Sequence, residues 1–249
     1  MIHFIMLGTR RTGSTVISNA LADHPQILQY GELFHDRASM RAAEAAHETM
    51  GAGVLRHLPN GLPTCLDADD GHDYLSRLFS QSTPAQAIGF KIFYHHARRG
   101  PIASVWDYLD RHTEIRILHI QRRNWLESLI SEERAKLTKI WHATNSVTTQ
   151  PFGIAPARCQ EYFGELKRWR AVIQPLLVNH PVLGLEYQQF TEDFSRTLTR
   201  ICCFLEVNSE ATMVPRLTKI AQQEPRAELV NYQELQTHFR NTPYADFFP

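Results

Sequence analysis

Short apolar runs, each followed by a longer amphipathic stretch, recur along the chain. Four of these runs have the length and the β-branched and aromatic content of strands: 2–7, 87–94, 114–120 and 181–187. Three of them are almost continuously apolar, which is typical of parallel strands covered by helices on both faces. The pattern therefore predicts a buried parallel sheet.

The stretches between these runs place apolar residues at helical spacing. Residues 14–22 form one predicted helix, stopped by Asp23-His24-Pro25, with an apolar face made of Val16, Ile17, Ala20 and Leu21. The stretch 157–179 carries a longer stripe: Tyr162, Phe163, Leu166, Trp169, Val172, Ile173, Leu176 and Leu177. The stretch 190–206 does the same with Phe190, Phe194, Leu198, Ile201, Cys202 and Leu205. Alternating strands and helices favour an α/β fold, in which helices cover both faces of a central parallel sheet.

The chain has no internal repeat, no low-complexity tract and no evident linker. We therefore expect one domain over residues 1–249. The Ala- and His-rich segment 35–72 predicts a helical insertion or lid, and the polar segment 139–156 a mobile loop.

Composition narrows the kind of ligand. The formal net charge is zero, so bulk attraction to nucleic acid or to an anionic membrane is not expected. Arginines nevertheless occur in pairs, at Arg10-Arg11, Arg98-Arg99 and Arg122-Arg123. Local positive sites on a neutral chain favour a small polyanionic ligand over a long polymer.

The four cysteines indicate neither a disulfide framework nor a zinc site, because no two have C-x-x-C spacing. The first residues lack the basic start and cleavage site of a signal peptide, and no apolar stretch has the length of a membrane span. We expect a cytoplasmic protein without a metal requirement.

The loop GTRRTGST, residues 8–15, resembles the phosphate-binding pattern G-x-x-x-x-G-K-[ST], except that Ser14 stands where the lysine belongs. A strand, a glycine-bearing turn and a helix in that order present backbone N–H groups at a helix N-terminus, which is an anion site. Ser14 and Thr15 add hydroxyl donors, and Arg11 adds a planar donor with several N–H groups. The loop is therefore predicted to bind an anion.

Two other functions compete at this point. A nucleotide kinase or NTPase would need the lysine at position 14 and an acidic strand end for Mg²⁺, whereas the chain has Ser14 and the basic strand end HIQRR (119–123). A noncatalytic module that binds an adenosine phosphate would need no base near the loop.

A second motif follows the strand at 114–120. Asn124 can cap a helix that carries Trp125, Leu126, Leu129 and Ile130 inward. Ser131 lies eight residues after Arg123, just over two helical turns, so both side chains can lie on one side and clamp a further phosphate. A surface arginine and an incidental helix serine are the alternative.

Together, GTRRTGST (8–15), HPQILQYGELF (24–34) and RRNWLESLIS (122–131) resemble the sulfotransferases that use 3′-phosphoadenosine 5′-phosphosulfate (PAPS), in particular their bacterial small-molecule and carbohydrate branch. Segments 182–207 and 229–248 are also similar to members of this family. The resemblance implies a P-loop-like sulfotransferase fold and sulfuryl transfer from PAPS, with PAP as product, to a small-molecule or carbohydrate acceptor. Whether the protein forms a homodimer stays open.

The resemblance also implies roles for individual residues. The first loop would bind the 5′-phosphosulfate through Arg10, Arg11, Thr12, Gly13, Ser14 and Thr15, and Arg123 and Ser131 would bind the 3′-phosphate. Arg226 is a further candidate contact with the cofactor. Many family members have proline at the position of Arg10 and serine at that of Thr12, which leaves open which arginine makes the closer contact.

An acceptor hydroxyl or amine also needs a base. The resemblance favours Glu32, because the bacterial carbohydrate branch has a glutamate in a Gly-Glu pair at this place. Other members use a histidine shortly after a strand lysine, which keeps His95 as the main alternative, with His35 and His96 as further candidates. Lys91 is expected to steady the transferring sulfuryl group.

Overall fold

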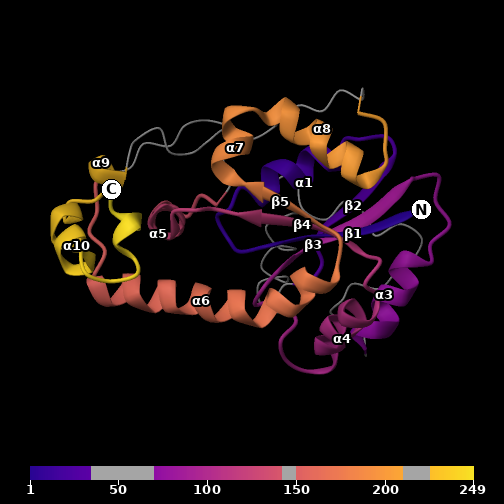
Figure 1. Cartoon of the computed structure of the whole chain (residues 1–249), viewed down its shortest axis with the longest axis horizontal. Coiled ribbons are helices and arrows are strands. Elements are labelled where there is room, and N and C mark those ends of the chain that lie inside the picture. The colour runs from indigo at the N-terminus through magenta and orange to yellow at the C-terminus, as the bar shows by residue number, and fades with distance from the viewer. Residues whose placement is uncertain (35–69, 142–149, 210–224) are drawn as a thin grey trace.

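The structure is a computed structural model that describes residues 1–34, 70–141, 150–209 and 225–249. Five strands form one parallel sheet in the order β2-β3-β1-β4-β5 (Figure 1). Their bounds are β1 Ile2–Gly8, β2 Ile27–Glu32, β3 Ala87–Phe93, β4 Arg116–Gln121 and β5 Val182–Glu186. The predicted α/β class is confirmed, and four of the strands lie where the sequence placed them. The fifth, β2, was not predicted, because an edge strand that is only partly buried lacks a continuous apolar run.

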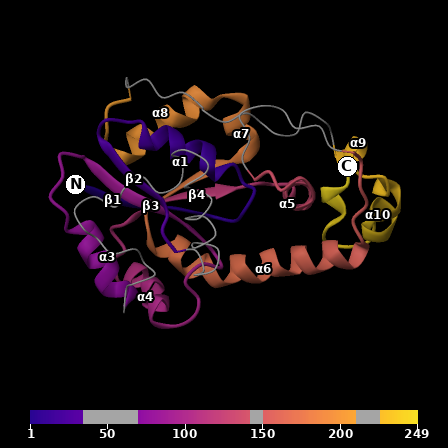
Figure 2. The same cartoon turned by 180° about the vertical axis from the view of Figure 1, so that it is seen from behind.

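Helices cover both faces of the sheet (Figures 1 and 2). On one face lie α1 (Ser14–Ala22), α7 (Tyr187–Glu192) and α8 (Phe194–Leu205), packed on alternate strand residues such as Phe4 and Met6. On the other face lie α3 (Gly71–Phe79), α4 (Ser104–Arg111) and the C-terminal half of α6 (Pro156–Asn179), packed on the intervening residues Ile5 and Leu7. Each face of the sheet thus has its own core.

A third core lies beside the sheet. It is formed by α5 (Trp125–Thr138), the N-terminal half of α6 and α10 (Tyr232–Phe239), with Phe163 in contact with several other aromatic rings. The short helix α9 (Pro225–Glu228) and the C-terminus lie at this end of the molecule (Figure 1). Two 3₁₀ turns, at Pro101–Ala103 and Ala245–Phe247, complete the described elements. The C-terminal half of α6 packs on the sheet and its N-terminal half belongs to the third core, so this helix connects the two.

The predicted helices 14–22 and 157–179 correspond to α1 and α6. Two details differ. Val172 is 53% exposed instead of lying in the apolar stripe. The stretch 190–206 is interrupted at Asp193, whose backbone is not helical and whose side chain accepts a hydrogen bond from the N–H of Arg196, so that a new helix, α8, begins there. Helices α3 and α4 were not predicted.

Several predictions fall on the remaining parts of the chain. Most of the predicted insertion 35–72 and the centre of the predicted loop 139–156 lie outside the described residues, as does Cys65. Cys159, Cys202 and Cys203 are free thiols. Among the residues that the structure describes, no helix is both long and apolar enough to span a membrane.

The pairing of β2 with β3 contains an irregularity that positions a charged residue. Ile27 to Gln29 pair in order with Ala87 to Gly89, but the next pair is Glu32 with Lys91, so β2 contains one extra residue. Because side chains alternate between the faces of a sheet, regular pairing would set Gly31 beside Lys91 and turn Glu32 to the opposite face. The bulge instead brings Glu32 to the face of Lys91, and Gly31 takes a left-handed φ of 69° there.

We expect Gly31→Ala to destabilise the protein and to lower activity. A Cβ in the left-handed region costs about 1–2 kcal/mol, and relief of that strain would shift the bulge and displace Glu32 from Lys91. The free energy of unfolding in urea measures the first effect, and the rate of the sulfuryl transfer that the resemblance implies measures the second.

Gly184→Ala is the matched control. Gly184 lies on the edge strand β5, and an added Cβ would meet no atom within 4 Å. Equal stability and activity in the two variants would contradict the role given to the bulge.

Candidate active site

The register of the central strands brings three chain segments to one edge of the sheet. Gly8, the last residue of β1, pairs with Phe93 of β3 and with Ile120 of β4. The residues that follow, Thr9, Tyr94 and Gln121, therefore emerge side by side at the carboxyl edge. Ligands of open α/β sheets bind at this edge.

The loop after β1 is held in a tight conformation. A Cβ at Gly8 would lie 2.6 Å from the carbonyl oxygen of Ile120, and one at Gly13 would lie 2.4 Å from the ring of Phe190. Gly13 has a left-handed φ of 76°, and so does Arg11, at 61°, although it carries a side chain. The hydroxyl of Thr12 donates to the carbonyl of Thr9 at 2.8 Å, so it closes the loop from within.

The loop leads directly into the N-terminus of α1. This helix begins at Ser14, and no side chain caps it. The first turn of a helix presents N–H groups without intrahelical partners and the positive end of the helix dipole. The loop and helix therefore have the geometry expected of an anion site, with Ser14 buried and Thr15 half-buried beside it, and anion binding there stays a prediction.

Arg11 joins this loop to α5. Its Nε donates to Oγ of Ser131 at 2.9 Å, and its Nη1 donates to the carbonyl oxygen of Trp141 at 2.7 Å. Burial lowers the pKa of Arg11, and the positive charges of Arg134 and Arg122 lower it further. A buried guanidinium among like charges favours an anion beside it. The structure thus brings together two residues that the sequence analysis assigned to different phosphates of one cofactor.

Arg10 points to a buried carboxylate that sequence reasoning missed. Its Nε lies 3.6 Å from Glu132 on α5, and Lys136 and Arg158 also pair with that carboxylate. Glu132 is only 1% exposed, so its charge depends on these partners. Lys136 is four residues along the same helix, but Arg10 and Arg158 come from distant segments, which is why the sequence does not reveal the whole cluster.

The arginines after β4 have different environments. Arg122 donates twice to Glu127 and lies over the ring of Tyr187, 4.3 Å from its centroid. Arg123 pairs with Glu186 at 2.7 Å but keeps a side chain that is 72% exposed. Asn124 caps α5 as predicted, by accepting from two backbone N–H groups. Ser131 contacts Arg11, so the clamp of Arg123 and Ser131 on a 3′-phosphate stays a prediction.

A buried cluster of three residues lies where the bulge brings β2 to β3. Nζ of Lys91 is 2.6 Å from Oε1 of Glu32 and donates to Oγ1 of Thr15 at 3.1 Å. The side chains of Lys91 and Glu32 are 5% and 13% exposed. The carboxylate, the ammonium and the end of the anion-binding loop are thus in direct contact, on the α1 face of the sheet.

The histidine candidates lie elsewhere. His95 lines a hollow on the α6 side, together with Thr9, Arg10 and four residues of α6, namely Tyr162, Glu165, Leu166 and Trp169. His96 is buried, and its ring Nδ1 accepts from the N–H of Phe93 at 3.2 Å. His35 lies outside the described residues. The structure therefore places Lys91 with Glu32 and sets His95 on the other face.

Arg226 lies in α9, at the third core. It donates to the carbonyl oxygen of Pro249 and lies 5.4 Å from the centroid of the Tyr232 ring. Glu228 of the same helix pairs with Arg134 of α5, the helix that also carries Ser131. A contact of Arg226 with the cofactor stays a prediction.

A hydrogen-bonded chain of side chains runs beneath the edge of β3 and β4. The hydroxyl of Tyr94 is 2.5 Å from Nε2 of His119, and Nδ1 of His119 is 3.0 Å from the side-chain amide of Gln121. Oε1 of Gln121 accepts from Arg170 of α6 at 2.7 Å. The only sequence signal for this chain is the polar His119 inside an apolar strand, which the sequence analysis did not use.

His119 should make the free energy of unfolding depend on pH. Burial, and then the charge of Arg170, lower its pKa from 6.5 to about 4. Between these values the unfolded chain binds a proton that the folded protein does not, so stability falls as the pH drops from 6.5 to 4 and is fully present above 6.5. The shift corresponds to about 3 kcal/mol.

In His119→Gln, stability should vary less between pH 7 and pH 4.5 than in the wild type, as measured by urea unfolding. The exposed His238→Gln is the control. An unchanged pH dependence in His119→Gln would contradict a buried neutral His119.

Among the described residues, no group of three or more His, Cys, Asp or Glu side chains is arranged to hold a metal ion. Comparisons with known proteins give a consistent picture. Nodulation protein H of Rhizobium tropici is 25% identical over 98% of this chain and 92% of its own length, and that of Rhizobium meliloti is 23% identical over 98% and 94%. The crystal structure of a sulfotransferase from Alicyclobacillus acidocaldarius matches the fold with a TM-score of 0.52, at 16% identity over all of this chain and 94% of the other. The model of the sulfotransferase family matches residues 4–211, and the chain is therefore a transferase that belongs to the sulfotransferase family.

Proposed function

We propose that this sulfotransferase transfers the sulfuryl group of PAPS to a hydroxyl or amine of a small-molecule or carbohydrate acceptor, by in-line displacement. The observation that carries the proposal is the contact of Lys91 with both Glu32 and Thr15 at the end of the anion-binding loop. It sets a carboxylate and a cation beside the place where a bound anion would lie.

The residues of the loop fit the phosphosulfate end of PAPS. The N-terminus of α1 has no side-chain cap, and Gly8 and Gly13 have no side chains. Main-chain N–H groups of the loop can therefore face a ligand. Arg11 adds a guanidinium that already reaches Ser131, one of the two residues assigned to the 3′-phosphate. Sulfotransferases generally use PAPS, which supplies the sulfuryl group and an adenosine bisphosphate leaving group.

The charges at the site suit sulfuryl transfer better than the transfer of a phosphoryl group from ATP. Ser14 replaces the lysine of the phosphate-loop pattern, and β4 ends at Gln121 and is followed by two arginines instead of an acidic residue for Mg²⁺. A sulfuryl group carries less charge than a terminal phosphoryl group. Fixed cations such as Lys91 and Arg11 can therefore stabilise the leaving oxygen without a metal-bridged triphosphate.

Glu32 is the proposed base. As the acceptor oxygen or nitrogen forms its bond to sulfur, the bond from sulfur to the 5′-phosphate oxygen breaks, and Glu32 takes the proton that the acceptor loses. Lys91 orients the carboxylate before the reaction and offsets charge on the sulfuryl oxygens. A general base typically contributes 10²- to 10⁴-fold in rate.

The 3′-phosphate should account for much of the affinity for PAP. We expect PAP to bind the wild type more tightly than AMP, and Arg123→Ala to weaken PAP by roughly ten- to a hundredfold, because one charge-assisted contact contributes about 1.5–3 kcal/mol. AMP, which lacks the 3′-phosphate, should bind the wild type and Arg123→Ala alike. Titration calorimetry measures both.

Arg196→Ala removes another exposed arginine and should leave PAP affinity unchanged. If Arg123→Ala bound PAP as tightly as the wild type does, the clamp would be wrong, and Arg122 would be the next candidate. Equal affinities of PAP and AMP for the wild type would mean that no residue of the protein binds the 3′-phosphate.

Glu32→Gln should abolish most turnover while PAP affinity stays near that of the wild type. Glutamine keeps the size of the side chain but cannot take the proton, so kcat should fall by roughly 10²- to 10⁴-fold. Because the change also leaves the buried Lys91 without its carboxylate, thermal unfolding must be measured in parallel.

Glu127→Gln is a matched control, because it also removes a carboxylate from an ion pair, here with Arg122. Turnover that survives in Glu32→Gln but vanishes in His95→Ala or His96→Ala would transfer the role of base to a histidine. A protein that binds PAP but transfers no sulfuryl group to any acceptor would instead favour the noncatalytic binding module.

A further inference from the structure

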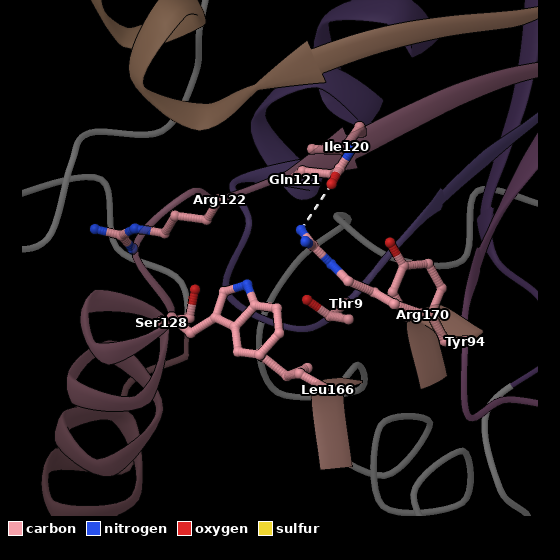
Figure 3. A pocket seen from close by; sticks show the side chains of 9 residues that line it. Thr9, Tyr94, Ile120, Gln121, Arg122, Ser128, Leu166 and Arg170 are labelled. Atoms are coloured by element: carbon pink, nitrogen blue, oxygen red, sulfur yellow. Dashed lines mark hydrogen bonds between the residues drawn. The ribbon is translucent and has the colours of Figure 1, made fainter. Parts of the chain in front are cut away.

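A hollow on the α6 side of the sheet edge is not used by the proposed donor site. The residues that line it come from the ends of β1, β3 and β4 and from α5 and α6: Thr9, Tyr94, Ile120, Gln121, Arg122, Trp125, Ser128, Leu166 and Arg170 (Figure 3). It comprises about 250 Å³ of empty space, counted with the solvent at its mouth. The enclosed part holds about one water-sized group, so a ligand would enter from the open mouth.

Arg170 reaches across this hollow in a fixed position. It comes from α6, donates to Oε1 of Gln121 at 2.7 Å and lies over the ring of Trp125, 4.9 Å from its centroid (Figure 3). Gln121 is in turn hydrogen-bonded to His119, whose other ring nitrogen contacts the hydroxyl of Tyr94. The guanidinium is therefore oriented by a buried chain of side chains that has no role in the proposed reaction.

The charge of Arg170 is not balanced within the described part of the chain. No carboxylate there lies within 4 Å of its guanidinium, whereas Arg122, on the same hollow, is paired with Glu127. In Figure 3, Arg122 points away from Arg170. His119 adds no second positive charge, since burial and Arg170 itself keep it neutral. A half-buried and oriented guanidinium without a carboxylate partner among the described residues is suited to receive an anion.

The position of the hollow relates it to the acceptor. Thr9 begins the anion-binding loop and lines the hollow, whereas Thr15 ends that loop and contacts Lys91 on the opposite face. A second hollow, which contains Arg10 and His95, shares Thr9 and Leu166 with the first. A molecule seated at Arg170 would therefore lie against the donor loop on the side away from α1.

We propose that Arg170 binds a carboxylate of the acceptor, and that this sulfotransferase modifies acidic acceptors such as uronic acids or hydroxylated aromatic acids. The inference rests on the proposed function. The planar guanidinium of Arg170 suits the two oxygens of a carboxylate. It has five N–H donors, and Gln121 accepts from one of them. The acid end of the acceptor is held on the α6 face, and its hydroxyl or amine must extend past Thr9, across the carboxyl edge of the sheet, to reach Glu32 on the α1 face.

The test compares acids with neutral partners of the same shape, in the presence of saturating PAP so that anions do not enter the donor loop. Glucuronate is compared with glucose, and 4-hydroxyphenylacetate with 4-hydroxyphenylacetamide, by titration calorimetry. In the wild type, the acid of at least one pair should bind about tenfold tighter or better, as expected for one charge-assisted contact.

Arg170→Gln should abolish this preference and leave PAP affinity unchanged. Arg170→Lys should reduce the preference, because an ammonium keeps the charge but not the planar pair of donors. Arg168→Gln, an exposed position on the same helix, is the matched control and should behave as the wild type does. If Arg170→Gln fails to fold, Arg170→Lys carries the comparison.

Two results would overturn the proposal: acids that bind the wild type no tighter than their neutral partners in both pairs, or a preference for acids that persists unchanged in the Arg170 variants. Failure of the donor site is a separate outcome. In that case PAP would not bind the wild type, and the acids would be titrated without it.

Discussion

The site depends on the burial of one ammonium group. Lys91 lies within β3, in a sheet covered on both faces, where an unpaired charge would be very costly. Its carboxylate partner must come from the neighbouring strand, yet regular pairing of β2 with β3 would turn Glu32 to the opposite face. The extra residue in β2 and the left-handed Gly31 resolve this conflict. A charge that the fold cannot leave unpaired thus determines the irregularity of an edge strand, and through it the position of the proposed base.

The donor loop illustrates a similar constraint. The turn from β1 into α1 must pass within contact distance of Ile120 and Phe190, which is why residues 8 and 13 have no side chain. Arg11 adopts a left-handed φ in the same turn, a conformation that costs about 1–2 kcal/mol in a residue with a Cβ. Its hydrogen bonds to Ser131 and to the carbonyl of Trp141 help to offset that strain. The guanidinium is therefore held in place before any ligand arrives.

Local signals in the sequence were sufficient for the class of fold, for four of the strands and for α1 and α6, because each is a run of neighbouring residues with a period. They failed where the structure depends on partners that are distant in sequence. The edge strand β2 lacks an apolar run, and Asp193 divides a continuous apolar stripe into two helices. The pair of Glu32 with Lys91, the contacts of Arg10 and Arg158 with Glu132, and the chain from Tyr94 to Arg170 join segments that only folding brings together.

The third core gives the molecule a further property. The loop of Arg11 belongs to the sheet, but Ser131 belongs to α5, which is anchored by Phe163 and its aromatic neighbours beside the sheet. A cofactor that spans both would hold two separately packed parts of the protein at a fixed separation. By mass action, part of its binding free energy would appear as resistance of the C-terminal region to local unfolding. Sequence changes in that aromatic cluster could then adjust how strongly the donor is retained, without any alteration of the residues that touch it.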